Sequence, residues 1–132
     1  MKFNTLMVIK AAVCLVLGVP MLIKPDLIYT IFGLNLEPGG AFAAREYGAS
    51  LLGALMITWF ARNTPESETR WAIALGYCVY DLFGFVASLV GVLNGIINPL
   101  GWLVVVLYLF FAVTFGYFTV RSPRTVMQAK TA

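Results

Sequence analysis

The chain has 132 residues, of which 61% are hydrophobic and only 11% charged, and it contains no histidine. Soluble domains average about 45–50% apolar and about 25% charged residues, and a small domain has too little interior to hide such an apolar excess. The composition therefore excludes an ordinary soluble domain and predicts a membrane protein. The net charge of +3 comes from scattered residues with no basic block, a pattern typical of topology signals and not of a nucleic-acid-binding surface.

Four apolar segments follow one another along the chain, at about 3–23, 40–61, 71–93 and 99–120. Each is close to the ~20 residues that a membrane-spanning helix needs. No alternation of polar and apolar residues suggests the strands of a membrane barrel. Breakers and charges separate the segments, in "KPDLIYTIFGLNLEPGG", "RNTPESETR" and "NGIINP". We therefore expect an all-α protein, a single domain over 1–132 that forms an integral membrane four-helix bundle.

The first connection contains a short amphipathic stretch, "PDLIYTIFGLN". It predicts a helix of one to two turns that begins at Asp26 and ends at Gly33. Its apolar face comprises Leu27, Ile28, Ile31 and Phe32. Such a helix would lie in the membrane interface between the first two spans, with Tyr29 at the level of the headgroups. A packed re-entry loop is the alternative.

The positive residues predict the orientation of the four spans. The first segment resembles a signal peptide, but Lys10 interrupts it and no small-residue cleavage site follows, so we expect an uncleaved helix. With four spans, one side of the membrane carries Lys2, Arg62, Arg70, Arg121, Arg124 and Lys130. The other side carries Lys24. The positive-inside rule then places both termini in the cytoplasm.

Both cysteines, Cys14 and Cys78, fall inside predicted spans and outside any Cys-x-x-Cys motif. We expect both to be reduced thiols that pack as small apolar side chains.

Four ionisable residues lie within the predicted spans: Lys10, Arg45, Glu46 and Asp81. A lysine, arginine or aspartate at the middle of a membrane costs about 2.5–3.5 kcal/mol on insertion scales. Because two of the four are positive and two negative, pairing can remove most of this cost.

Depth along the helices suggests which of these residues pair. At 1.5 Å per residue, Asp81 falls near the middle of its span, while Arg45 and Glu46 lie roughly 7–8 Å outward of the middle of theirs. We expect Arg45 to face the bundle and to pair with Asp81. Lys10, roughly 5 Å inward, either reaches Asp81 or extends to the interface. Glu46 projects about 100° from Arg45 and needs a different partner face.

The third span places Tyr77, Asp81, Gly84 and Ser88 on one face at helical spacing. The residues of the candidate polar centre are therefore Arg45, Glu46, Asp81, Lys10 and Tyr77. The small residues around them also fit simple close packing of helices, in which the charges form a structural lock with no ligand.

Several motifs together carry a resemblance to a known family. These are "AREYGASLLGALMI" in the second segment, "YCVYDLFGFVASLVG" in the third, "NPLGWLVVVLYL" in the fourth and "KPDLIYTIFGL" before the second. In this order they resemble small four-helix bacterial membrane proteins of the DoxX-like kind, over nearly the whole chain. The resemblance implies a bacterial inner-membrane protein and an accessory or lipophile-binding subunit of a quinone-linked oxidoreductase, with Arg45 and Asp81 as its polar centre. It supplies no catalytic residues.

Three classes of function stay open. The first is an accessory subunit that binds a quinone or a lipid and associates with the bilayer, with larger membrane subunits or with its own copies. The second is an enzyme on a lipophilic substrate, with Glu46 and Asp81 as general acid and base. No histidine, redox cysteine pair, metal-binding motif or nucleotide loop supports that class. The third is a small proton-coupled transporter built around a buried carboxylate.

Overall fold

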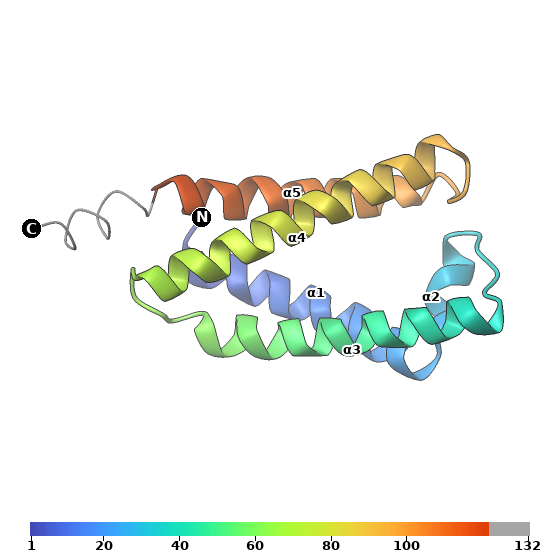
Figure 1. Cartoon of the computed structure of the whole chain (residues 1–132), viewed down its shortest axis with the longest axis horizontal. Coiled ribbons are helices and arrows are strands. Elements are labelled where there is room, and N and C mark those ends of the chain that lie inside the picture. Colours follow the sequence, from blue (N-terminus) through green and yellow to red (C-terminus); the bar gives the residue numbers. More distant parts are fainter. Residues whose placement is uncertain (122–132) are drawn as a thin grey trace, which may run out of the picture. The chain divides into compact units, whose positions relative to one another are not determined.

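The computed structural model describes residues 1–121, and within that range the chain is helical with no strand (Figure 1). The helices in chain order are α1 (Phe3–Ile23), α2 (Pro25–Ile31), α3 (Pro38–Ala61), α4 (Glu68–Leu93) and α5 (Gly101–Arg121). The all-α prediction is confirmed. Arg124 and Lys130, which contributed to the predicted orientation, lie outside the described residues.

The four predicted segments correspond to the four long helices, with limits that differ by no more than one helical turn. Among the described residues, α1, α4 and α5 are long and apolar enough to span a membrane, which marks the chain as an integral membrane protein. α3 has 24 residues but is not one of these three. Its first half contains Arg45 and Glu46, which lower its hydropathy. The four-helix membrane bundle therefore stays a prediction.

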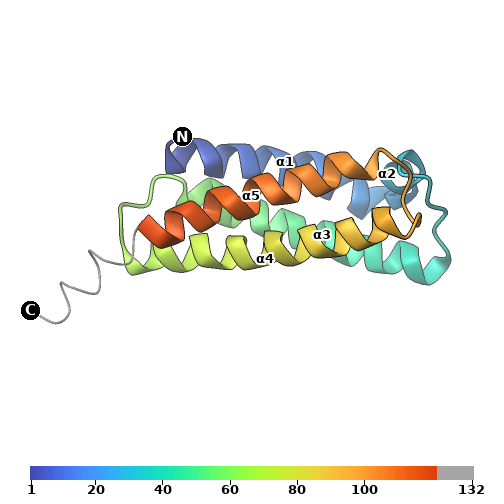
Figure 2. The same cartoon turned by 90° about the horizontal axis from the view of Figure 1, so that it is seen from above.

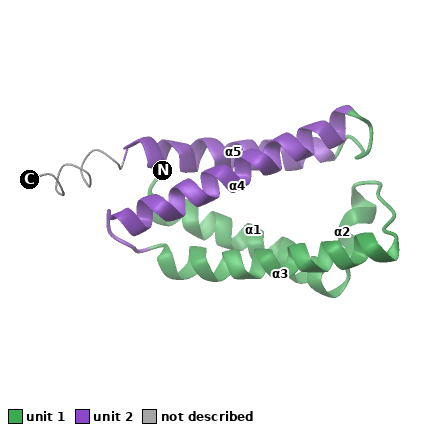
Figure 3. Cartoon of the chain, viewed as in Figure 1, with its two compact units in different colours: residues 1–62, 94–100 green, residues 63–93, 101–132 purple. Residues whose placement is uncertain are grey.

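The chain divides into two compact units (Figure 3). Unit 1 comprises Met1–Arg62 and Asn94–Leu100, and unit 2 comprises Asn63–Leu93 and Gly101–Ala132. In unit 1, α1 packs along α3 and contacts α2, and in unit 2, α4 packs along α5 (Figures 1 and 2). The expectation of a single domain over 1–132 stays a prediction.

The pair of α1 and α3 in unit 1 is held by close backbone contact. A core cluster of Cys14, Met21 and Leu51 lies between the two helices. Nearby, a methyl group added to Gly48 would lie only 2.7 Å from the backbone nitrogen of Leu22. Only glycine fits there, so the two backbones approach each other directly, as small residues allow in membrane helices.

The short helix α2 is formed as predicted, although it begins at Pro25 and not at Asp26. Proline suits the first helical position because its missing N–H has no intrahelical partner there. Ile28 and Tyr29 pack against the core cluster of unit 1, and burial raises the pKa of the Tyr29 phenol above its ordinary value. Placement of α2 in the membrane interface stays a prediction.

A Schellman motif ends α2 at the predicted glycine. Gly33 has a φ of 79°, which a residue with a side chain rarely adopts. Its N–H donates to the carbonyl of Thr30 at 3.0 Å, and the N–H of Leu34 donates to the carbonyl of Tyr29 at 3.0 Å. These two bonds satisfy two of the four carbonyls that a helix end leaves without partners.

Asn98, from the connection between α4 and α5, supplies the other two bonds. Its backbone N–H donates to the carbonyl of Phe32 at 3.0 Å, and its Nδ2 donates to the carbonyl of Ile31 at 2.9 Å. Its Oδ1 also accepts a hydrogen bond from the N–H of Leu100 at 3.0 Å. One asparagine thus completes the end of α2 and fixes the turn that leads to α5.

In unit 2, two hydrogen bonds join the first half of α4 to the second half of α5. Nε1 of Trp71 donates to the carbonyl of Thr119 at 3.2 Å, and the thiol of Cys78 donates to the carbonyl of Ala112 at 3.5 Å. Cys14 and Cys78 are both free cysteines, as expected. Cys14 is buried, whereas Cys78 is half-buried and does not pack as a purely apolar side chain, because its thiol donates a hydrogen bond.

We predict that Asn98→Ala loosens the end of α2. The substitution removes two side-chain hydrogen bonds, each contributing about 0.5–1.5 kcal/mol to stability. Hydrogen–deuterium exchange followed by mass spectrometry should show faster exchange over 31–36. Asn94→Ala is the matched control, since Asn94 lies exposed in the same connection. Equal exchange in the two variants would contradict the proposed role of the Asn98 side chain.

The number of spans is tested by the location of two connections. With four spans, reporter fusions within 34–40 and within 64–67 lie on opposite sides of the membrane, because α3 crosses between them. The predicted orientation puts 64–67 in the cytoplasm and 34–40 on the far side. If both fusions report the same side, α3 does not cross and the four-span prediction is wrong.

Candidate functional site

The centre of the candidate site is the carboxyl group of Asp81. Its side chain is 0% exposed, which is rare for an aspartate. It lies on the buried face of α4, which comprises Ala74, Tyr77, Asp81 and Gly91. Of the four residues that the spacing placed on one face, Tyr77 and Asp81 are buried, and Gly84 and Ser88 are half-buried.

Aromatic residues of α5 line the site within unit 2. The rings of Tyr77 and Phe115 stack with their centroids 5.1 Å apart. One turn beyond Asp81, the ring of Tyr108 lies on the bare backbone of Gly84, where an added methyl group would come within 2.4 Å of a ring carbon. Since Phe115 faces Tyr77 and Tyr108 faces Gly84, the antiparallel register puts Phe111 at the level of Asp81.

These rings form a continuous stripe along α5 that consists of Tyr108, Phe111 and Phe115. Phe111 and Phe115 are fully buried, and their centroids lie 6.2 Å apart. Tyr80 of α4 also approaches Tyr108, with a centroid distance of 6.3 Å. The aromatic stripe of α5 thus passes the level of Asp81 on the adjacent helix.

Such an arrangement has limited chemical options. A carboxyl group offers two oxygens that accept hydrogen bonds, and a donor as well when it is protonated. Aromatic rings supply large flat apolar surfaces and stack with other rings. The face therefore suits a polar head attached to an apolar or aromatic body, and it can hold a proton away from bulk water.

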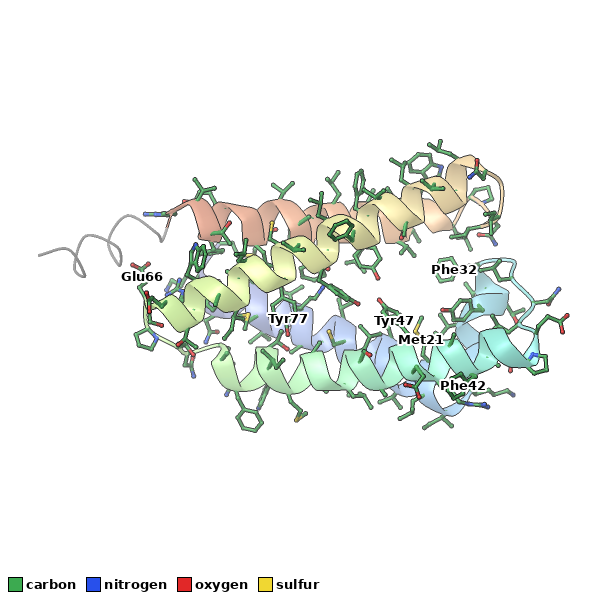
Figure 4. The ribbon with its side chains drawn as sticks, in the orientation of Figure 1. Met21, Phe32, Phe42, Tyr47, Glu66 and Tyr77 are labelled. Atoms are coloured by element: carbon green, nitrogen blue, oxygen red, sulfur yellow. The ribbon has the colours of Figure 1, made fainter. Side chains whose placement is uncertain are left out.

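The other predicted site residues have different surroundings. Lys10 is buried in α1, with 3% of its surface exposed, and lies on the stripe of α1 that also contains Cys14 and Gly18. Arg45 and Glu46 are both exposed on α3. Tyr77, labelled in Figure 4, is buried on α4.

The pairing of Arg45 with Asp81 stays a prediction, because Arg45 belongs to unit 1 and Asp81 to unit 2. The exposed guanidinium gives no support to the expectation that Arg45 points into the bundle. The same division leaves the alternative contact of Lys10 with Asp81 as a prediction.

Sequence reasoning missed the aromatic wall of α5. Phe111 and Phe115 are four residues apart and therefore share a helix face, but α5 is apolar on every side, so no polar residue marked which face was buried. Gly84 could have indicated this face, since a glycine within a helix often marks a place where another group approaches the backbone closely. Here that group is the Tyr108 ring.

Within residues 1–121, no group of three or more histidine, cysteine, aspartate or glutamate residues could hold a metal ion. Comparison of the chain with protein-family models, with curated proteins and with solved structures gave no match.

We predict that Gly84→Ala destabilises unit 2, because the added methyl group overlaps the Tyr108 ring. Overpacking of this kind typically costs about 1–3 kcal/mol. Thermal unfolding in detergent should show a lower midpoint than in the wild type. Gly76→Ala is the control, since Gly76 has open space around its Cα and alanine is the better helix former by up to about 1 kcal/mol. Equal midpoints for the two variants would contradict the close contact of Gly84 with Tyr108.

Proposed function

We propose that this protein is an integral membrane subunit that binds a lipophilic molecule with a polar head, a quinone or a lipid, at Asp81. The observation that carries the proposal is the complete burial of the Asp81 side chain beside the aromatic stripe of α5. Ionisable residues within membrane helices are costly, and by default they mark substrate, ion or ligand sites.

The chemistry around Asp81 supports this class of ligand. Binding sites for small molecules combine mainly apolar and aromatic walls with a few placed polar groups. Phe111 and Phe115 provide the wall, while Asp81 and the Tyr77 phenol provide polar atoms on the adjacent helix. A quinone ring or an ester-linked headgroup offers both flat apolar surface and oxygens for hydrogen bonds.

The membrane arrangement of the proposal has four spans, with α2 in the interface. The exposed apolar side chains of Leu27 and Ile31, 56% and 53% exposed, suit contact with lipid at that level. The distribution of lysine and arginine favours both termini in the cytoplasm. The DoxX-like resemblance favours a bacterial inner membrane and an accessory role beside larger redox subunits.

The proposal predicts that the purified protein retains a lipophile and that Asp81→Asn does not. The amide keeps the shape of the side chain but replaces one acceptor oxygen with an NH2 donor, and it can neither carry the charge nor release a proton. Protein from mild detergent should be extracted and its quinones and lipids quantified by mass spectrometry. Asp26→Asn, at an exposed acid of α2, is the control that should retain the ligand.

Equal retention by wild type, Asp81→Asn and Asp26→Asn would contradict binding at Asp81. The thermal midpoints of the three proteins show whether Asp81→Asn is still folded. A folded Asp81→Asn variant without ligand has lost binding and not its helical structure.

A further inference from the structure

α3 exposes two opposite charges on one side of a helix that is otherwise apolar or small. Its buried residues, Ala44, Gly48, Leu51 and Thr58, lie on one face. Arg45 and Glu46 are exposed, and within residues 1–121 neither side chain forms an ion pair. Charged side chains are costly in a lipid environment, so these two need partners if α3 crosses the membrane.

The two charges flank a defined line along the helix. Consecutive residues project about 100° apart, so a face centred between Arg45 and Glu46 has the guanidinium on one flank and the carboxylate on the other. At 3.6 residues per turn, that line runs through Phe42, Ala49, Gly53, Met56 and Phe60, all of which are exposed. In Figure 4, Phe42 and the partly buried Tyr47 leave α3 on opposite sides.

This face is complementary to itself. When two copies of a helix pack in parallel about a two-fold axis, the left flank of one lies against the right flank of the other. Arg45 of one copy then meets Glu46 of the partner subunit, and the same contact is repeated on the other side of the axis. The four charges of the two copies therefore form two ion pairs, with no residue from a different protein.

The middle of the face permits the required approach. Ala49 and Gly53 form a small-xxx-small pair of the kind that lets membrane helices come close. A methyl group added to Gly53 would have no atom within 4 Å. This glycine therefore has no packing role in the described fold, in contrast to Gly48 on the opposite side of α3.

We propose that the exposed face of α3 binds a second copy of this chain, in parallel, through reciprocal Arg45–Glu46 ion pairs across Ala49 and Gly53. The interface is independent of the ligand proposed at Asp81. It pairs Arg45 with Glu46 of the partner subunit and not with Asp81, so substitution experiments can distinguish the two pairings.

Disulfide crosslinking tests where the copies meet. In full-length protein carrying Cys14→Ala and Cys78→Ala, reconstituted in liposomes at a low protein-to-lipid ratio, Gly53→Cys should form a disulfide dimer on mild oxidation. Gly76→Cys is the matched control, because Gly76 is also an exposed helical glycine with open space around it, about two turns from the 62–67 connection. It should stay monomeric, and equal crosslinking of the two variants, or none, would overturn the interface.

Charge exchange tests the ion pairs, with association measured by energy transfer between labelled copies in liposomes. Arg45→Glu and Glu46→Arg each place like charges against one another, and each should raise the dissociation constant by about tenfold through the loss of both pairs. Two samples restore opposite charges across the interface. One is the double variant Arg45→Glu/Glu46→Arg, and the other is an equal mixture of the two single variants. Both should associate about as well as the wild type.

Two neutralising substitutions separate the two assignments of Arg45. Reciprocal pairing predicts that Arg45→Gln and Asp81→Asn have additive effects on the thermal midpoint, whereas a direct pair makes the double variant lose less than the sum. Failure of the mixed single variants to associate, or coupling between Arg45→Gln and Asp81→Asn, would overturn the proposal. The proposal would also be overturned if wild-type copies associated and Arg45→Glu associated with the same dissociation constant.

Discussion

The cost of taking ionisable groups out of water constrains every part of this molecule. The chain places Lys10, Arg45, Glu46 and Asp81 in helices whose other residues favour a bilayer. A carboxylate in an apolar interior has to be paired, hydrogen-bonded or neutral. Asp81 is the extreme case, since its side chain is fully buried on the face of α4 that Tyr77 shares, and Tyr77 stacks on Phe115 of α5. The register of α4 on α5, with Gly84 beneath Tyr108, puts Phe111 at the level of that carboxyl group.

The sequence predicts the helices well because each is a long run of apolar residues between breakers. It also predicts the end of α2, since Gly33 is the residue type that the left-handed conformation at a helix end requires. The face of α4 with Tyr77 and Asp81 follows from helical spacing alone. These features depend on residues near one another in the chain, where spacing and conformational preference carry the information.

Other features depend on contacts between distant residues and could not be read from spacing. Asn98 completes the end of α2 although more than sixty residues separate them, and nothing in "NGIINP" indicates this partner. The buried face of α5 carries no polar marker, so Phe111 and Phe115 were indistinguishable from residues that face lipid. Depth along a helix predicts the cost of a charge but not the direction in which its side chain points. Arg45, which we expected to face the bundle, is exposed, and Lys10, for which two directions were open, is buried.

A photoaffinity experiment tests the central claim, which is that the site at Asp81 holds a lipophile. A quinone and a phospholipid, each with a photoreactive diazirine on its tail, are incorporated separately into membranes that contain the protein, and labelled peptides are mapped by mass spectrometry. The account predicts that one of the two probes labels 77–84 and 108–115, that excess unlabelled ligand suppresses this labelling, and that Asp81→Asn abolishes it. The claim would be contradicted if both probes labelled exposed residues outside these segments, such as Leu93 and Val106, and if this labelling did not saturate and was unchanged in Asp81→Asn.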